Sequence, residues 1–199
     1  MLFDVTYKEI KTETSSVYVE RGSKFIAYTF RVYDEKEAKT KINEIKKSEP
    51  SANHYCYAYV LNPDKSNYRI NDDGEPKSTA GRQIYKQIQK FQLTNILIVV
   101  VRYFGGIKLG IPGLIRCYST SALLAIEKTK ILTKDIEEKY YLHFRYNEIN
   151  EVMKLMKEYN LRIIEKKFDS NCKLTFMVPK IKSKIIIKRI KENHKLSLL

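Results

Sequence analysis

Three basic side chains lie close in sequence to a glycine-rich turn, and together they predict a site for an anion. Arg102 precedes the turn, Lys108 lies within it and Arg116 follows it. Glycines leave backbone N–H groups accessible, and such groups bind phosphate or carboxylate when positive charge is close to them. The predicted anion- or partner-binding residues are Arg102, Tyr103, Gly105, Gly106, Lys108, Gly110 and Arg116.

The order of residues in this turn excludes the two common nucleotide-binding loops. A Walker A loop has Lys and then Ser or Thr after its second glycine, but Ile111 and Pro112 follow Gly110. The Gly-x-Gly-x-x-Gly spacing of dinucleotide-binding folds is also absent. A second interpretation stays open, in which the glycines only permit a tight turn between a strand and a helix.

A second group of reactive side chains surrounds an acidic loop. His54 precedes it on a predicted strand, and Asp72, Asp73 and Glu75 lie in the polar segment itself. Side chains of these types bind divalent metals or act as acid and base in a hydrolase. An enzyme of this kind, either a metal-assisted hydrolase or one that binds a nucleotide or phosphate, is therefore the alternative function.

We favour a structural role for this loop, in which its carboxylates form ion pairs with Arg82, Arg102 or Lys108. Such pairs would hold one loop against another, so we predict no catalytic residue, resident metal or cofactor. The residues assigned to this structural motif are His54, Asp72, Asp73, Gly74, Glu75, Thr79, Gly81 and Arg82.

The composition indicates a basic protein with reduced thiols. Among 199 residues, 37 Lys and Arg oppose 23 Asp and Glu, and a net charge of +14 attracts polyanions. The charge is compatible with nucleic-acid or ribosome association and equally with a merely basic surface. Cys56, Cys117 and Cys172 show no metal-ligand spacing and are expected to be buried thiols. The first residues do not resemble a secretory signal, and no apolar run is long enough to span a membrane, so a cytoplasmic location is expected.

The elements around the glycine turn are predicted from hydrophobic periodicity. Residues 96–101 form a run typical of a strand buried on both faces. The pattern from Gly113 to Ile126 predicts a helix with Pro112 at its first position and with Leu114, Ile115 and Tyr118 on its inner face.

Further elements precede these two along the chain. Strands over 16–19 and 23–32 form a hairpin, and Asp34 begins a helix with Glu37 in a capping box. A strand over 54–61 and a short one over 68–70 follow. Ser78 or Thr79 is expected to cap a helix that continues through Phe91.

The pattern changes near residue 133, which predicts a second domain. Residues 140–146 alternate as a strand, Asn147 is expected to cap a helix, and a hairpin turns at residues 169–171. A helix over 180–192 and a short strand over 196–198 complete the order β-α-β-β-α-β of a ferredoxin-like unit. The fold class is therefore α+β, with domains at 1–132 and 136–199 that join near 129–136.

The second domain carries the higher density of positive charge. From residue 136 to residue 199, 15 Lys and Arg oppose 8 Asp and Glu, and the last helix holds many of these cations. Tyr141, His143 and Arg145 share a strand face, and Lys173 and Thr175 extend it. A sheet face with aromatic and basic side chains resembles an RNA-binding platform, although a solvated face or a surface against the first domain is equally compatible.

Three separated motifs resemble those of one known family. They are ERGSKFIAY (20–28), HYCYAYV with NDDGEPKSTAGRQI (54–84) and VVVRYFGGIKLGIPGLIRCYSTSA (99–122). Their order is similar to that of the YigZ/IMPACT family, also called uncharacterised protein family 0029. Ile111 and Pro112 depart from the small residues usual in the family at that place, which affects the shape of the predicted anion site.

The resemblance implies a fold and a process. It implies a first domain similar to domain 2 of ribosomal protein S5, and a small C-terminal domain. Eukaryotic members restrain the amino-acid-starvation response, but they do so with an additional N-terminal domain that this sequence lacks. We therefore expect a non-enzymatic cytoplasmic protein of translation regulation that binds RNA, the ribosome or a protein partner, and no membrane.

Overall fold

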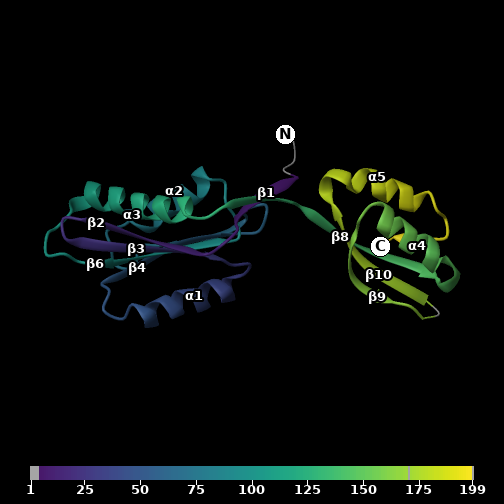
Figure 1. Cartoon of the computed structure of the whole chain (residues 1–199), viewed down its shortest axis with the longest axis horizontal. Coiled ribbons are helices and arrows are strands. Elements are labelled where there is room, and N and C mark those ends of the chain that lie inside the picture. The colour runs from purple at the N-terminus through teal and green to yellow at the C-terminus, as the bar shows by residue number, and fades with distance from the viewer. Residues whose placement is uncertain (1–4, 170, 199) are drawn as a thin grey trace. The chain divides into compact units, whose positions relative to one another are not determined.

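The computed structural model describes residues 5–169 and 171–198 and divides them into two compact units. The larger unit comprises residues 7–134, and the smaller unit comprises residues 135–198 together with residues 5 and 6 (Figure 1). Ser170, at the centre of the second predicted hairpin, lies outside the described residues. No helix in the described ranges is long and apolar enough to cross a membrane.

A five-stranded antiparallel sheet forms the centre of the larger unit, with the order β2-β3-β6-β4-β5. Its strands are β2 (Thr14–Glu20), β3 (Ser23–Arg31), β4 (His54–Leu61), β5 (Asn67–Asn71) and β6 (Ile96–Tyr103). Every residue from Ile96 to Val101 is fully buried, which confirms the strand predicted there. Arg21 and Gly22 join β2 to β3 with φ angles of 46° and 77°, as a two-residue hairpin turn requires.

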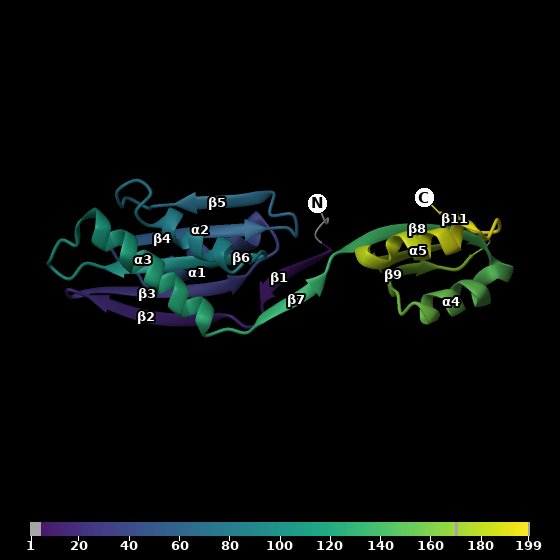
Figure 2. The same ribbon diagram turned by 90° about the horizontal axis from the view of Figure 1, so that it is seen from above.

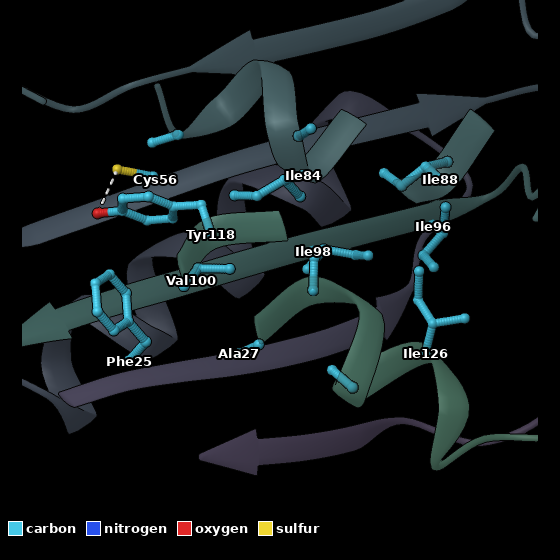
Figure 3. Packing of buried hydrophobic residues seen from close by; sticks show 14 of the residues in the cluster. Phe25, Ala27, Cys56, Ile84, Ile88, Ile96, Ile98, Val100, Tyr118 and Ile126 are labelled. Atoms are coloured by element: carbon cyan, nitrogen blue, oxygen red, sulfur yellow. Dashed lines mark hydrogen bonds between the residues drawn. The ribbon is translucent and has the colours of Figure 1, made fainter. Parts of the chain in front are cut away.

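Helices cover both faces of this sheet. Figure 1 shows α1 (Glu35–Ser48) on one face and α2 (Gly81–Lys90) with α3 (Gly110–Glu127) on the other. The apolar core beneath α2 and α3 includes Phe25, Ile84 and Tyr118 (Figure 3). Because successive residues of a strand point to opposite faces, the arginine at position 102 of β6 faces α2 and α3, while its neighbour at position 103 faces α1.

The helix starts agree only in part with the sequence prediction. Asp34 caps α1 by accepting a hydrogen bond from the Glu37 amide at 2.7 Å, as predicted, although the Glu37 carboxylate bonds to the Tyr33 amide. The helix α3 begins at Gly110, two residues before the predicted first position, so Pro112 is its third residue. Ile115 is 36% exposed, which contradicts its predicted place on the inner face.

Two short strands that the sequence analysis did not predict pair with each other. Strand β1 (Thr6–Ile10) and strand β7 (Ile131–Asp135) form a separate two-stranded sheet, which Figure 2 shows beside the larger unit. The side chain of Glu9 on β1 is fully buried, and it forms ion pairs with Lys134 on β7 and with Arg31 at 3.7 Å. The segment expected to join the domains therefore contains a strand with a buried ion pair.

The smaller unit has a four-stranded antiparallel sheet with the order β11-β8-β10-β9. Its elements are β8 (Glu137–Arg145), η1 (Tyr146–Glu148), α4 (Ile149–Glu158), β9 (Arg162–Lys167), β10 (Asn171–Pro179), α5 (Lys180–Lys191) and β11 (Ser197–Leu198). The predicted order of strands and helices is confirmed. Asn147 does not cap α4, because the chain first forms the short helix η1, and Glu148 is the N-cap residue.

Both helices of the smaller unit pack on the same face of its sheet. Leu142 and Phe176 on the strands share a core with Val152 and Met156 of α4 and with Ile186 of α5. The side chains that alternate with this core along β8 and β10 point to the opposite face, which neither helix of the unit covers.

Candidate functional site

The glycine turn lies between the end of β6 and the start of α3, and it packs closely on the β2–β3 hairpin. A Cβ atom added to Gly105 would lie 1.9 Å from the carbonyl carbon of Gly22, which no side chain could tolerate. The Gly105 amide also donates a hydrogen bond to the hydroxyl of Ser23 at 3.2 Å. Packing against Gly22 therefore requires a glycine at position 105, independently of any ligand.

Arg102 does not lie on the surface of the turn. Its side chain is 7% exposed, and its guanidinium contacts the carboxylate of Glu75 at 2.6 Å. Burial beside Glu75 neutralises this charge and closes it to a ligand from solution. The prediction that Arg102 contributes to a surface anion site therefore needs correction, and the ion pair considered for the acidic loop is the one that forms.

The other predicted residues of the turn have separate surroundings. Lys108 is exposed, and the Arg116 guanidinium, 60% exposed, contacts the carboxylate of Glu20 at 2.8 Å. Tyr103 faces the α1 side, where its hydroxyl donates a hydrogen bond to Glu49 at 2.5 Å. Gly106 and Gly110 are exposed as well. Lys108 and Arg116 thus lie at the surface, Arg116 as the partner of Glu20, and they are not gathered around Arg102.

The surface of the turn is also apolar, which the sequence analysis did not predict. Phe104, Ile107 and Ile111 are 49%, 55% and 57% exposed. Exposed apolar side chains in this number are unusual on one short segment of a folded chain. Ile115, in the helix that follows the turn, is 36% exposed as well, although its spacing predicted a buried position.

The acidic loop is held by backbone hydrogen bonds. The Asp72 carboxylate accepts hydrogen bonds from the amides of Ser78 at 2.8 Å, Ala80 at 3.1 Å and Gly81 at 2.9 Å. Asp72 therefore accepts hydrogen bonds from free backbone amides at the start of α2, eight and nine residues later in the chain. The predicted caps are wrong: Ala80 is the N-cap residue, and the Thr79 hydroxyl donates to the carbonyl of Pro76 at 2.6 Å.

The neighbouring residues of the loop bind it to strand β4. The Asp73 carboxylate accepts a hydrogen bond from the Tyr55 amide at 2.7 Å, and the Asp73 carbonyl lies 2.8 Å from His54 Nδ1. Gly74 has a φ of 86°, and a Cβ atom added to it would lie 3.5 Å from Nδ1 of His54. Arg82 is exposed on α2 and is not among the cations that pair with this loop.

Glu75 is the residue at which the separated motifs meet. Besides Arg102, its carboxylate accepts a hydrogen bond from the Tyr118 hydroxyl at 2.8 Å, and His54 Nε2 lies 3.9 Å away. The Sγ atom of Cys56 lies 3.3 Å from the same hydroxyl, as Figure 3 shows. We call His54, Cys56, Glu75, Arg102 and Tyr118 the Glu75 cluster; it connects β4, the acidic loop, β6 and α3.

Two members of the Glu75 cluster, Cys56 and Tyr118, are fully buried. Burial raises the pKa of the Cys56 thiol and of the Tyr118 hydroxyl, so both stay protonated and neither is an activated nucleophile. Asp72, Asp73 and Glu75 already accept hydrogen bonds from the protein. Among residues 5–169 and 171–198, no three His, Cys, Asp or Glu side chains are placed to hold a metal ion.

The uncovered sheet face of the smaller unit brings the predicted RNA-platform residues together. Tyr141 pairs with Thr175 across β8 and β10, and His143 pairs with Lys173. Tyr141 is 45% exposed and Lys173 is exposed, whereas Thr175 is only 8% exposed. Arg145, at the end of the strand, is exposed as well.

Two further cations of this face were not identified from the sequence. Lys167 of β9 lies opposite Lys173, and the Lys139 ammonium lies 5.4 Å from the centre of the Tyr141 ring. Counting back by two residues from Tyr141 would have found Lys139. The place of Lys167 depends on the register of β9 against β10, which no local pattern contains. We call Lys139, Tyr141, His143, Arg145, Lys167 and Lys173 the open sheet face.

Comparison with known proteins gives consistent matches. The model of the Impact N-terminal domain family matches residues 21–126. The IMPACT family member YvyE of Bacillus subtilis is 35% identical over 160 residues, which are 77% of this chain and 74% of that protein. A protein IMPACT homolog of Dictyostelium discoideum is 37% identical over 101 residues, but these cover 49% of this chain and 29% of that protein.

A solved structure matches nearly the whole length of the chain. It is described as the crystal structure of a hypothetical protein, and it covers 99% of this chain and 98% of its own. The TM-score is 0.77 at 26% sequence identity. The similarity therefore includes the smaller unit, which lies beyond the residues that the family model matches.

Proposed function

Because this chain belongs to the IMPACT family, as its motifs predicted, we propose that it is a non-enzymatic binding protein that acts in translation regulation. The open sheet face of the smaller unit is the surface that contacts RNA, free or within the ribosome. We place this activity in the cytoplasm and assign it no cofactor. The proposed role in translation regulation is inferred from the role that the family resemblance implies for eukaryotic members.

The observation that carries this proposal is the composition of the open sheet face. Tyr141 offers a half-exposed ring on which a base can stack, and the cations around it are placed to contact phosphates. Glu165 lies opposite Thr175 on the same face, Glu137 pairs with Arg162, and Asp169 lies 3.4 Å from Lys167. Lys139, Arg145 and Lys173 have no acidic partner among these contacts, so positive charge still prevails on this face. Sheet faces of this kind bind single-stranded RNA by stacking and by charge, without a dedicated pocket.

The fold supports the proposal at the level of topology. The strand order β11-β8-β10-β9, with both helices on one face, is that expected for a ferredoxin-like unit, to which we assign residues 136–199. We assign residues 1–132 to a domain similar to domain 2 of ribosomal protein S5. In the larger unit, Lys108 and Arg116 beside the glycine turn provide a second, weaker contact for an anion or partner.

The enzymatic alternative has less support. A hydrolase centred on His54, Asp72, Asp73 and Glu75 would need carboxylates that are open to a substrate or metal. Asp72 instead accepts bonds from three amides, and Glu75 pairs with Arg102 below the surface. These contacts give the carboxylates of the acidic loop a structural role, which is to stabilise the fold.

RNA binding in a salt series tests the proposal. We expect a fluorescently labelled single-stranded RNA to bind the full chain and to bind Tyr141→Ala about 5- to 150-fold more weakly, the range that follows from loss of one stacked base. Lys173→Glu should weaken binding and reduce the slope of log K against log salt by about 1 or more, since a phosphate contact is lost.

Matched controls distinguish this site from diffuse attraction. Tyr33 is 49% exposed and Lys39 is exposed, and both lie near or in α1 of the larger unit. Tyr33→Ala and Lys39→Glu should leave the affinity nearly unchanged. If they weaken binding as much as the variants of the open sheet face do, the net charge alone attracts the RNA and the proposal is wrong.

A further inference from the structure

Helix α5 exposes two isoleucines on the side that faces away from the core. Its Ser183, Ile186 and Ile190 are buried against the sheet, whereas Ile181 and Ile185 are 62% and 68% exposed. Residues four apart lie on the same side of a helix, so these two side chains form one apolar strip. Apolar side chains of a partner would gain free energy by covering this strip, because burial removes its apolar surface from water.

Positive charge borders the strip on both sides. At 100° per residue, Lys184, Lys188 and Lys191 lie on one side of the two isoleucines, and Lys182 and Arg189 lie on the other. The first turn of the helix contains no acidic residue. Arg189 lies 3.9 Å from the carboxylate of Glu192, and this weak pair leaves the surface strongly basic.

A groove of about 500 Å³ runs along the side of α5 that carries the lysines. Tyr140 of β8 and Ile187 contribute its apolar surface. Three lysines, Lys184, Lys188 and Lys191, outnumber one carboxylate, Glu192, in its lining, so the groove carries a net positive charge. This volume is within the range of natural binding pockets and is sufficient for a few side chains. Lys184 and Lys188 border the apolar strip and also line the groove, so one ligand can contact both.

We propose that α5 and its groove form a docking site for an acidic amphipathic segment of a protein partner. Apolar side chains of the segment would cover Ile181 and Ile185 and enter the groove beside Ile187. Its carboxylates would contact the lysines at the border, and this charge complementarity would select acidic segments over basic ones.

The chemistry of the site favours a protein segment over other partners. RNA would leave the two isoleucines exposed, since bases stack on flat rings or guanidinium groups. A lipid bilayer is flat and would leave the groove unfilled. A second copy of this chain would place a basic helix against another one, which repulsion opposes.

This site is separate from the open sheet face. Ile186 of α5 packs on the face of the sheet that carries Phe176, and Tyr141 points to the opposite face. RNA and a protein segment can therefore occupy the smaller unit at the same time. The inference does not rest on the proposed RNA binding, and either can fail without the other.

A designed peptide tests this site without knowledge of the natural partner. The probe is a fluorescein-labelled helix of about 18 residues, or five turns, with Leu along one face and Glu elsewhere. A peptide of the same composition in scrambled order serves as its control. Binding to the full chain is measured by fluorescence anisotropy, and amide shifts in the NMR spectrum of the labelled protein locate the contact.

Two variants of α5 separate the apolar from the charged contribution. Ile181→Ser/Ile185→Ser should weaken binding of the amphipathic peptide about tenfold or more, and Lys184→Glu/Lys188→Glu should abolish it. Because all four side chains face solvent, these variants should keep the circular dichroism spectrum of the parent. Val17→Ser/Val19→Ser, which removes two similarly exposed β-branched side chains from strand β2 of the larger unit, should bind as the parent does.

Several results would overturn the proposal. Equal affinity for the scrambled peptide, or unchanged affinity of the Ile181→Ser/Ile185→Ser variant, would show that charge alone attracts the probe. Amide shifts outside residues 181–191 and Tyr140 would place the contact elsewhere. Loss of RNA binding, of binding to phosphatidylserine vesicles or of self-association in that same variant would assign the strip to RNA, a bilayer or a second copy.

Discussion

The Glu75 cluster predicts a large loss of stability when its central carboxylate is replaced. In Glu75→Gln the shape of the side chain is kept, but the Arg102 guanidinium stays buried without its counter-charge. Arg102 is 6% exposed, and among the described residues its Nε atom already has no hydrogen-bond partner. Removing one member of a buried ion pair costs about 3–5 kcal/mol of unfolding free energy, and we expect a loss of this size.

A double-mutant cycle isolates the interaction. Arg102→Met alone should also destabilise the chain, since Glu75 then loses its ion pair and keeps the hydrogen bond from Tyr118 and the 3.9 Å contact with His54. The double variant Glu75→Gln/Arg102→Met should be clearly more stable than the sum of the two losses predicts, because neither charge is left unpaired. Tyr118→Phe should cost about 1 kcal/mol, the value of one hydrogen bond.

Urea unfolding provides the measurement. The chain has no Trp and 15 Tyr, so tyrosine fluorescence and far-ultraviolet circular dichroism are the suitable signals. The effect should appear in the transition of the larger unit. Glu192→Gln, which removes an exposed carboxylate 3.9 Å from Arg189, is the control and should change stability by less than about 1 kcal/mol. A loss below about 1 kcal/mol for Glu75→Gln, or strict additivity in the cycle, would refute the reasoning.

Three further outcomes are expected. Gly105→Ala should prevent folding or severely lower the melting temperature, because its Cβ would collide with Gly22. Gly106→Ala has open space and should cost only about 1 kcal/mol for its φ of 85°. Similar melting temperatures for the two variants would contradict this account of the turn. Asp72→Ala removes the acceptor for the start of α2 and should cost about 0.5–2 kcal/mol in urea unfolding, while a neutral effect would show that water satisfies those amides equally well. Burial raises the pKa of Cys56 above its ordinary 9.0, so this thiol should resist iodoacetamide at pH 8 until urea is added. The contribution of the protonated Cys56 thiol to the free energy of unfolding is full below pH 9.0 and is lost as the pH rises further, so unfolding at pH 10 should show a less stable chain.

Local signals in the sequence were sufficient where a local interaction determines the structure. The β2–β3 hairpin follows from Arg21-Gly22 between alternating residues, and the start of α1 follows from Asp34 and Glu37. The buried run at 96–101 also specified its strand, because a stretch so apolar is stable only inside the fold.

The arrangement of the site was less predictable, because it depends on contacts between distant segments. The pairing of Glu75 with Arg102 was one of several combinations. It depends on the register that places His54 opposite Arg102 and on the contacts that hold the acidic loop against His54. Asp72 caps a helix eight and nine positions later, beyond the reach of the usual capping pattern. The exposure of Ile115 shows that periodicity identifies an apolar position but not whether another element covers it.

The pairing of β1 with β7 has a consequence for synthesis of the chain. Glu9 leaves the ribosome early, but its partner Lys134 belongs to the last strand of the larger unit. Until that strand emerges, the unit cannot close around Glu9 without burying a carboxylate that lacks its nearest counter-charge. The nascent larger unit should therefore complete its folding only after β7 has been released, and a fragment cut at residue 132, within β7, would lack this final step.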